Sequence, residues 1–211
     1  MRMRPTLART GFTVSREAGV PVETIAGERH AWRFRLHFHA GDEIVRVLAG
    51  RARLRLPDGC REVAAGDTLI VPAGVAHRFE PLDRRGWAFV SRFAPAPRMA
   101  TREITTLATR ATALLAQRRS LHTDVAAVAQ SCAVSAGHLS RVFRRETGCS
   151  LHNFQVLLAL QQAKMLLRHQ VPVVEATLAA GFYDQPHLNR EFVRTYGMTP
   201  ATFRNGWAAA A

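Results

Sequence analysis

The spacing of hydrophobic residues changes near the middle of the chain. From about Trp32 to Phe93, apolar and polar residues alternate, and turn residues interrupt the alternation at short intervals. A period of two is typical of β-strands with two different faces. Beyond about residue 105, glycine and proline become scarcer and the apolar residues recur at helical spacing. We therefore predict an α+β protein of two domains, with strands in the N-terminal half and helices in the C-terminal half.

Turn signals refine this division. Asp58-Gly59 lies between two alternating runs and predicts a β-hairpin, and several short strands at this spacing favour a small antiparallel β-barrel. The stretch from Phe93 to Arg98 contains Pro95 and Pro97 and is the natural boundary. We assign residues 1–95 to the barrel, 96–104 to a linker and 105–207 to an all-α domain whose first helix covers about 103–119.

The C-terminal half contains an internal repeat. His138 to Arg145 aligns with His187 to Arg194 at an offset of 49 residues, and glycines and phenylalanines downstream stay aligned. Each copy predicts a helix, a tight turn and a second helix, at about 124–148 and 173–197. Ser135 and Asp184 are suitable N-caps of the second helices, and Gly148 and Gly197 are suitable stops.

The helix after each turn has two faces. In the first copy Leu139, Val142 and Phe143 fall at i, i+3 and i+4, which predicts a buried stripe. The opposite face bears the arginine, asparagine and glutamine side chains that read bases in the major groove. A solvated surface would also explain one such face, but two aligned faces favour DNA. The expected contacts are Gly137, Ser140, Arg141 and Arg144 in the first copy and Gln185, Pro186, Asn189 and Arg190 in the second, with Arg145 and Arg194 on the flanks near phosphates.

The second copy, from Ala179 to Arg204, resembles the signature segment of the AraC family of transcription regulators. The resemblance implies two helix-turn-helix units joined by a long helix over 150–168, about 28 Å long. Such a helix would set two recognition helices into successive major grooves, about 34 Å apart. Two departures concern the connecting helix and the helix before the second turn. Ala159 and Gln162 replace expected arginines, and Ala176-Thr177 replaces the usual Ile-Ala.

The N-terminal half resembles the cupin barrel through His37, His39, Glu43 and His77. The resemblance implies that these side chains converge on one divalent ion. The sequence supports part of this directly, because alternate residues such as His37 and His39 share a strand face. Three imidazoles and a carboxylate suit Zn, Fe, Ni, Cu or Mn. Pro81 stands where the family has asparagine, and regulators of this kind often keep such histidines only to line an effector pocket.

Charge and composition fit this assignment. The net charge of +13 favours a polyanionic partner, although the basic residues are spread along both halves and do not locate a binding site. Arg33 and Arg35 have the strand parity of the histidines, so they could face an acidic effector or lie elsewhere. Three widely spaced cysteines predict core residues of a reducing compartment, not a disulfide framework. The sequence has neither a signal peptide pattern nor a membrane-length apolar run, so we expect a cytoplasmic protein.

Two interpretations remain open. The favoured one is a sequence-specific transcription regulator, not an enzyme, that is controlled by a small effector or metal in the barrel. The alternative is a metal-dependent cupin enzyme fused to a DNA-binding domain. Double-stranded DNA and a small-molecule effector are the expected partners. RNA polymerase and a second copy of the chain are further candidates, and no membrane partner is expected.

Overall fold

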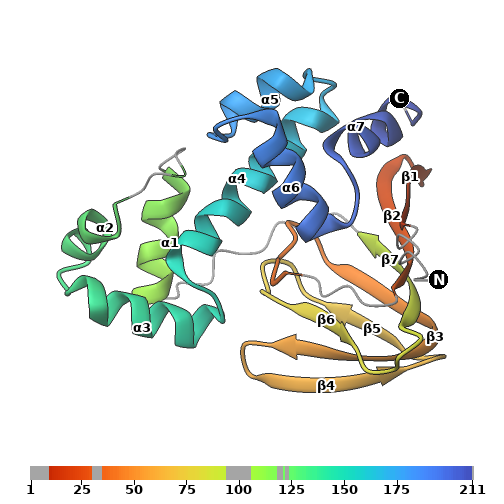
Figure 1. Cartoon of the computed structure of the whole chain (residues 1–211), viewed down its shortest axis with the longest axis horizontal. Coiled ribbons are helices and arrows are strands. Elements are labelled where there is room, and N and C mark those ends of the chain that lie inside the picture. The colour runs from red at the N-terminus through yellow and green to blue at the C-terminus, as the bar shows by residue number, and fades with distance from the viewer. Residues whose placement is uncertain (1–9, 30–34, 94–105, 118–120, 122–123, 211) are drawn as a thin grey trace, which may run out of the picture.

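The computed structural model describes residues 10–29, 35–93, 106–117, 121 and 124–210. Its strands all precede its helices, and Figure 1 shows the sheet beside the helices. The strands are β1 Thr10–Glu17, β2 Val20–Arg29, β3 Glu43–Leu56, β4 Gly59–Ala64, β5 Thr68–Val71, β6 Arg78–Pro81 and β7 Trp87–Phe93. The helices are α1 Leu107–Gln117, α2 Val125–Ser131, α3 Ala136–Thr147, α4 Leu151–Arg168, α5 Val173–Ala179, α6 Gln185–Tyr196 and α7 Pro200–Ala208. We call residues 10–93 the sheet half and 106–210 the helical half.

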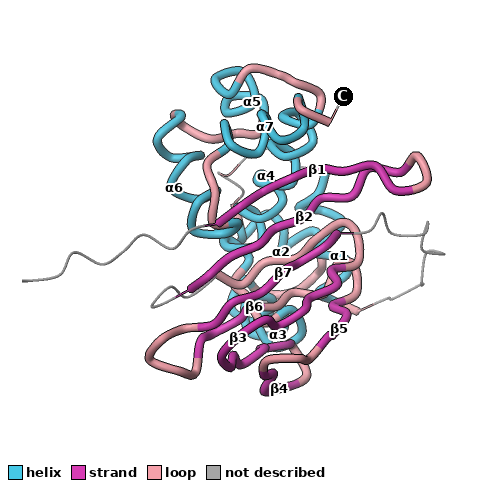
Figure 2. The backbone as a smooth tube through the Cα atoms, turned by 90° about the vertical axis from the view of Figure 1, so that its right-hand side faces the viewer, coloured by secondary structure: helices cyan, strands magenta, loops and turns pink. Residues whose placement is uncertain are grey.

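The sheet half is an antiparallel sheet with the order β1-β2-β7-β3-β4. The long strand β3 organises it, because its first part pairs with β5 and β7 and its last part pairs with β4 and β6. A register shift between Val47 and Ala49 separates these two parts. The same strand therefore connects all the other strands except β1 and β2 directly, and Figure 2 shows the strands side by side across the front of the molecule.

Gly50 is a glycine for a steric reason. Its φ is +71°, and a Cβ atom there would lie 2.4 Å from the Gly86 carbonyl oxygen. A side chain would therefore strain the backbone and collide with the turn before β7. The close approach of β3 to β7 at this point depends on the missing side chain.

The helical half consists of two similar groups joined by α4, which runs between them in Figure 1. The side chains of Ser135, Ser150 and Asp184 accept backbone N–H bonds at the starts of α3, α4 and α6. Gly148 and Gly197 end α3 and α6 in the left-handed conformation. These capping interactions satisfy backbone groups that a helix leaves unpaired at its ends, so they fix where each helix begins and stops.

The buried residues form two clusters that do not follow the division into halves. One cluster joins α1, α2, α3 and the start of α4. The other contains sheet residues such as Val45 and Phe93 together with Leu160 of α4 and Phe192 of α6. The group around α6 therefore shares its hydrophobic core with the sheet half, whereas the group around α3 has a core largely its own.

Several expectations need correction. The expected strand from Trp32 onwards is not regular in its described part: residues 35–39 are extended, with an isolated bridge between His37 and His77. The β1–β2 hairpin and α7 were not predicted, and Cys60 is exposed instead of buried. The expected linker over 96–104 lies outside the described residues. None of the described helices is long and apolar enough to cross a membrane.

Candidate functional site

The two predicted recognition helices are α3 and α6, and they present the expected faces. Leu139 and Phe143 of α3 and Leu188 and Phe192 of α6 are fully buried, which fixes the rotation of each helix. The predicted contact residues are all exposed: Gly137, Ser140, Arg141, Arg144 and Arg145 on α3, and Gln185, Pro186, Asn189, Arg190 and Arg194 on α6. Each helix thus offers a polar, basic outer surface that is available to a partner.

The arginines on these surfaces differ in their partners. Within the described part of the chain, no acidic side chain pairs with Arg141, Arg144 or Arg190. By contrast, Arg145 lies 3.6 Å from the Glu146 carboxylate and Arg194 lies 3.3 Å from the Glu191 carboxylate. The central arginines therefore keep their full hydrogen-bonding capacity for a ligand, and the flanking pair does not.

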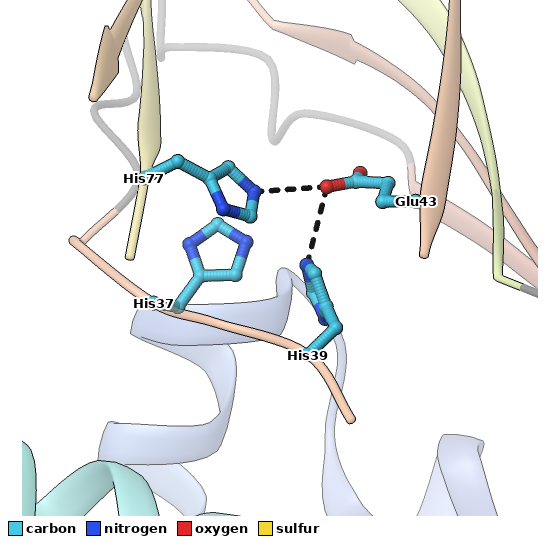
Figure 3. A group of neighbouring side chains, drawn as sticks. All are labelled: His37, His39, Glu43 and His77. Carbon is cyan, nitrogen blue, oxygen red and sulfur yellow. Dashed lines mark hydrogen bonds and ion pairs between the residues drawn. The ribbon is translucent and has the colours of Figure 1, made fainter. Parts of the chain in front are cut away.

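A second candidate site lies inside the sheet half. One possible ligand atom from each of His37, His39, Glu43 and His77 lies within 4.8 Å of all the others, and all four side chains are buried. Figure 3 shows His37 and His39 on the segment before β3, Glu43 opposite them, and His77 beside His37. The Glu43 carboxylate lies 2.8 Å from His77 Nε2 and 3.2 Å from His39 Nε2. All four residues that the resemblance to the cupin barrel implied are therefore brought together.

The hydrogen bonds of the cluster suit metal ligation. The Nδ1 atoms of His37 and His77 lie 2.8 and 2.9 Å from the backbone carbonyls of Arg35 and Val75. A carbonyl accepts only, so each Nδ1 carries the proton and a neutral ring turns an Nε2 lone pair inwards. The Nε2 atom of His77 then faces a carboxylate oxygen, an arrangement that needs a proton or a cation between the two atoms. His39 Nδ1 lacks a hydrogen-bond partner among the described residues, and His39 Nε2 faces the Glu43 carboxylate at 3.2 Å.

The charge states of the four cluster residues also suit metal ligation. Burial, together with neighbouring His77 and His39, holds the pKa of His37 well below its usual range, and burial also lowers the pKa of His39. Burial alone would raise the pKa of Glu43, but His39 and His77 outweigh it and hold the pKa well below the usual range. Neutral imidazoles around an ionised carboxylate are the protonation states that a divalent metal requires. The residues present therefore fit a bound metal ion.

The histidine segment also touches the helical half. The side-chain amide of Gln161 in α4 donates to the Phe38 carbonyl at 2.8 Å and to the Tyr196 hydroxyl at 3.3 Å. The Tyr196 ring, at the end of α6, meets the His37 ring edge-on at 6.4 Å. Arg35 forms an ion pair with Glu191 of α6, and Arg33 lies outside the described residues. The candidate metal site and a recognition helix are thus direct neighbours, which the sequence pattern did not reveal.

A buried ionic contact joins the two halves nearby. Glu23 of β2 accepts hydrogen bonds from Lys164 Nζ at 3.2 Å, from Arg168 Nη2 at 2.6 Å and from Trp207 Nε1 at 3.0 Å. Burial would raise the pKa of Glu23, but the charges of Lys164 and Arg168 outweigh it, and the pKa lies below its usual range. Sequence reasoning missed this cluster. The one available signal was the presence of a single lysine, Lys164, in a chain rich in arginine.

The residues of the helical half that differ from the AraC-family pattern make packing and hydrogen-bond contacts in this structure. Gln162 donates a hydrogen bond to the Ala179 carbonyl at 3.3 Å, which links α4 to α5. Ala176 and Thr177 are buried, and the Thr177 hydroxyl donates to the Val173 carbonyl within α5. These substitutions therefore leave the second helix-turn-helix unit well packed.

Known protein families match each half of the chain. A helix-turn-helix domain family matches residues 128–206, and a cupin domain family matches residues 22–83. The arabinose operon regulatory protein of Salmonella typhimurium is 35% identical over 86 residues, which are 40% of this chain and 31% of that protein. The transcriptional activator RhaR of Cronobacter sakazakii is 34% identical over 74 residues, 35% of this chain and 26% of that protein. The chain thus spans less than a third of these relatives.

A solved structure also matches half of the chain, at lower sequence identity. The AraC-type DNA-binding transcriptional regulator from Chromobacterium violaceum covers 50% of this chain and 95% of its own, with 24% identity and a TM-score of 0.46. The family matches fall on the two parts that the structure builds from helices and from strands. The chain therefore carries a helix-turn-helix domain in its C-terminal half and a cupin domain in its N-terminal half.

Proposed function

We propose that this protein is a sequence-specific DNA-binding transcription regulator whose activity responds to a ligand in or beside the cupin domain. The observation that carries the proposal is the pair of matched recognition helices, α3 and α6. Each buries a Leu/Phe stripe and exposes arginines that no acid of the described chain neutralises. The net charge of +13 supports a nucleic-acid partner, and the two relatives above are named as transcription regulators.

Within this proposal, Arg141 and Arg190 read bases. They occupy equivalent places in the first two turns of α3 and α6, where a helix lying in the major groove meets the base edges. Gly137, Ser140, Arg144, Gln185, Pro186 and Asn189 share these faces. Arg145 and Arg194, which already pair with glutamates, contact phosphates at the flanks. Because α4 links the two helices rigidly, the two reading positions should lie about one helical turn of DNA apart.

His37, His39, Glu43 and His77 would hold one divalent transition metal. When bound, the ion would fix the segment before β3 to the sheet and offer a Lewis-acid site to an oxygen of an effector. The direct contacts of this segment with α4 and α6 give a route from the cupin domain to a recognition helix. A second copy of the chain and RNA polymerase are further partners under this proposal. The alternative of a metal-dependent enzyme requires turnover of a small molecule, which an assay of the isolated cupin domain would detect.

The test uses the full chain and a binding site selected from random or genomic DNA. Affinities are measured for this site and for its single-base variants, with Arg141→Ala, Arg190→Ala and the wild type. Each replacement should make the free energy of binding to the selected site less favourable by about 1–3 kcal/mol. Each should also reduce base specificity at one position only. The two positions should lie one helical turn apart.

Arg145→Ala and Arg194→Ala are the matched controls, since they remove the same charge from the flanks of the same helices. They should weaken binding to all sequences alike and reduce the dependence on salt. If Arg141→Ala and Arg190→Ala weaken binding to all sequences equally, these arginines contact phosphates. The proposal that they read bases would then be wrong. A folded chain with no salt-dependent binding to any DNA would overturn the proposed function itself.

A further inference from the structure

A cavity of about 270 Å³ lies between the two halves, beside the Glu23 cluster. Its sheet-half wall comes from the start of β2, the end of β7 and the turn at residues 39–41. Its helical-half wall comes from α4 and from Trp207 of α7. His39 of the candidate metal cluster forms part of the lining. We propose that this cavity is the effector site of the regulator and binds a small monocarboxylate through Lys164 and Arg168. This inference rests on the proposed function, and names the chemistry of its effector.

The charges around the cavity favour an anion. Its ionisable lining consists of Glu23, His39, Lys164 and Arg168. Lys164 and Arg168 both lie within hydrogen-bond distance of the single Glu23 carboxylate, so two cationic side chains face one anionic side chain. These three side chains therefore carry one net positive charge. The Lys164 and Glu23 side chains are only 7% and 4% exposed, whereas Arg168 is 37% exposed. A buried charge is costly unless it is paired, and a single carboxylate would complete the balance.

The Lys164 ammonium has N–H donors that its hydrogen bond to Glu23 does not use. An ammonium has three N–H donors, and among the described residues Nζ has one hydrogen-bond acceptor, Glu23 Oε2 at 3.2 Å. Its other neighbours are the faces of Tyr196 and Phe203, whose ring centroids lie 4.9 and 5.0 Å away. Aromatic faces attract a cation but do not satisfy its hydrogen bonds. A ligand carboxylate beside Glu23 would accept these donors, and Arg168 would supply a second cation.

The remaining walls determine the body of the ligand. Phe93, Pro21 and the Trp207 ring supply apolar surface, and Trp207 also stacks against the Arg168 guanidinium at 5.3 Å. The cavity volume lies just below the range of about 300–1,000 Å³ that is usual for drug-sized ligands. The Gln161 amide on the same wall is already used by Phe38 and Tyr196. A compact aromatic or branched acid therefore fits better than a sugar or a polyanion.

The position of the cavity explains how such a ligand would act. Lys164 and Arg168 lie on α4, the helix that joins the two helix-turn-helix units, whereas His39 and Phe93 belong to the sheet half. A ligand bound across this boundary stabilises the docked arrangement of the two halves, since it binds that arrangement and not a separated one. The orientation of α4 relative to the sheet is then linked to ligand concentration.

The single lysine of the chain provides a direct test. The full-length protein is labelled with ¹³C-lysine, so that Lys164 gives the one lysine side-chain signal in the NMR spectrum. Benzoate, phenylacetate and isobutyrate are titrated, with benzamide as the neutral counterpart of benzoate. At least one carboxylate should shift the Lys164 signal in a saturable manner and raise the midpoint of thermal unfolding, and benzamide should do neither.

Variants locate the effect. Arg168→Gln should weaken carboxylate binding at least tenfold, and Lys164→Met should abolish the rise in the thermal midpoint. Arg46→Met, which removes a positive charge from the exposed face of β3, should respond like the wild type. Lys164→Met is not essential to the test, because the wild-type titration and Arg168→Gln decide the outcome if it fails to fold.

Two outcomes would overturn the inference. One is a Lys164 signal that none of the three carboxylates moves, and the other is a signal that benzamide moves equally. DNA binding by the same preparation separates this failure from failure of the proposed function. Retained binding to the selected site with no carboxylate response rejects only the effector site, whereas loss of DNA binding in a folded wild type rejects the regulator.

Discussion

At the scale of single residues, the cupin cluster shows how backbone groups prepare side chains for a ligand. The carbonyls of Arg35 and Val75 accept the Nδ1 protons of His37 and His77, so the Nε2 atoms of these rings are left for the interior. The Glu43 carboxylate, held in its ionised form by the adjacent histidines, supplies the negative charge. The four side chains therefore already have the tautomers and charges that a divalent cation requires.

This arrangement predicts metal in the purified protein. After expression with Zn, Fe, Ni, Cu and Mn supplied, elemental analysis should find about one transition metal per chain. His39→Ala should remove it, because the His39 imidazole is one of the four ligands and faces the Glu43 carboxylate inside the cluster at 3.2 Å. His169→Ala, at the exposed end of α4, should keep the metal. Metal-free wild-type protein would leave the four residues as the lining of a pocket.

The resemblance to the cupin barrel predicted this cluster, whereas no feature of the sequence predicted the Glu23 cluster. His37 and His39 are two residues apart, Glu43 lies near them, and only His77 is contributed from a distance. Glu23 and Lys164 are separated by 141 positions, and their contact depends on how the two halves dock. A periodic sequence pattern contains no information on such a contact. The residues of the proposed effector cavity can therefore be identified only from the three-dimensional structure.

At the scale of elements, local capping interactions set the ends of the recognition helices. Ser135 and Asp184 begin α3 and α6, and glycines at φ near +75° end them. These signals are contained within a few residues, so the sequence predicts both helix-turn-helix units almost to the residue. The β1–β2 hairpin was not predicted, since it precedes the alternating run that begins at Trp32. The segment 35–39 was expected as a strand, but its one described bridge is that between His37 and His77.

Two glycines on and after α3 should respond oppositely to the same substitution. Gly148→Ala should lower the free energy of unfolding by about 1–2 kcal/mol, because alanine is strained at a φ of +74°. Gly137→Ala should raise it by about 0.5–1 kcal/mol, since Gly137 is helical and an added Cβ atom meets nothing within 4 Å. Chemical denaturation of both variants measures the difference. Equal effects would show that the left-handed stop does not control the end of α3.

At the scale of the whole molecule, the second helix-turn-helix unit is bound to the cupin domain more closely than the first. Its core is continuous with that of the sheet, and Glu191 of α6 pairs with Arg35. The first unit has a largely separate core. A ligand or metal in the cupin domain is therefore placed to act on α6 directly. It can act on α3 through α4 and through Leu36 and Phe38, which pack against the core of the first unit.

Removing Glu23 should weaken this docking strongly. Glu23→Gln leaves the buried Lys164 charge without its counter-ion, and we expect it to lower the free energy of unfolding at pH 7 by about 3 kcal/mol. Adding Lys164→Met to this variant should recover part of the loss, because the unpaired charge is then removed as well. A double variant no more stable than Glu23→Gln would show that the two residues do not act as a pair.

The pH dependence of the same comparison tests the charge state of Glu23. In the folded protein the pKa of Glu23 is lowered, because the charges of Lys164 and Arg168 outweigh the effect of burial. In the unfolded protein a glutamate has a pKa of about 4.3. A lowered folded pKa gives stability that is complete above the unfolded value and is lost as the pH falls through the folded value. The stability difference between wild type and Glu23→Gln should therefore be constant from pH 7 to about 5 and shrink below that, as protonation makes glutamate resemble glutamine. Unfolding curves at successive pH values measure this difference directly. A difference that grows on acidification would mean that Glu23 is protonated in the folded protein, and the cavity beside it would then carry two uncompensated cations.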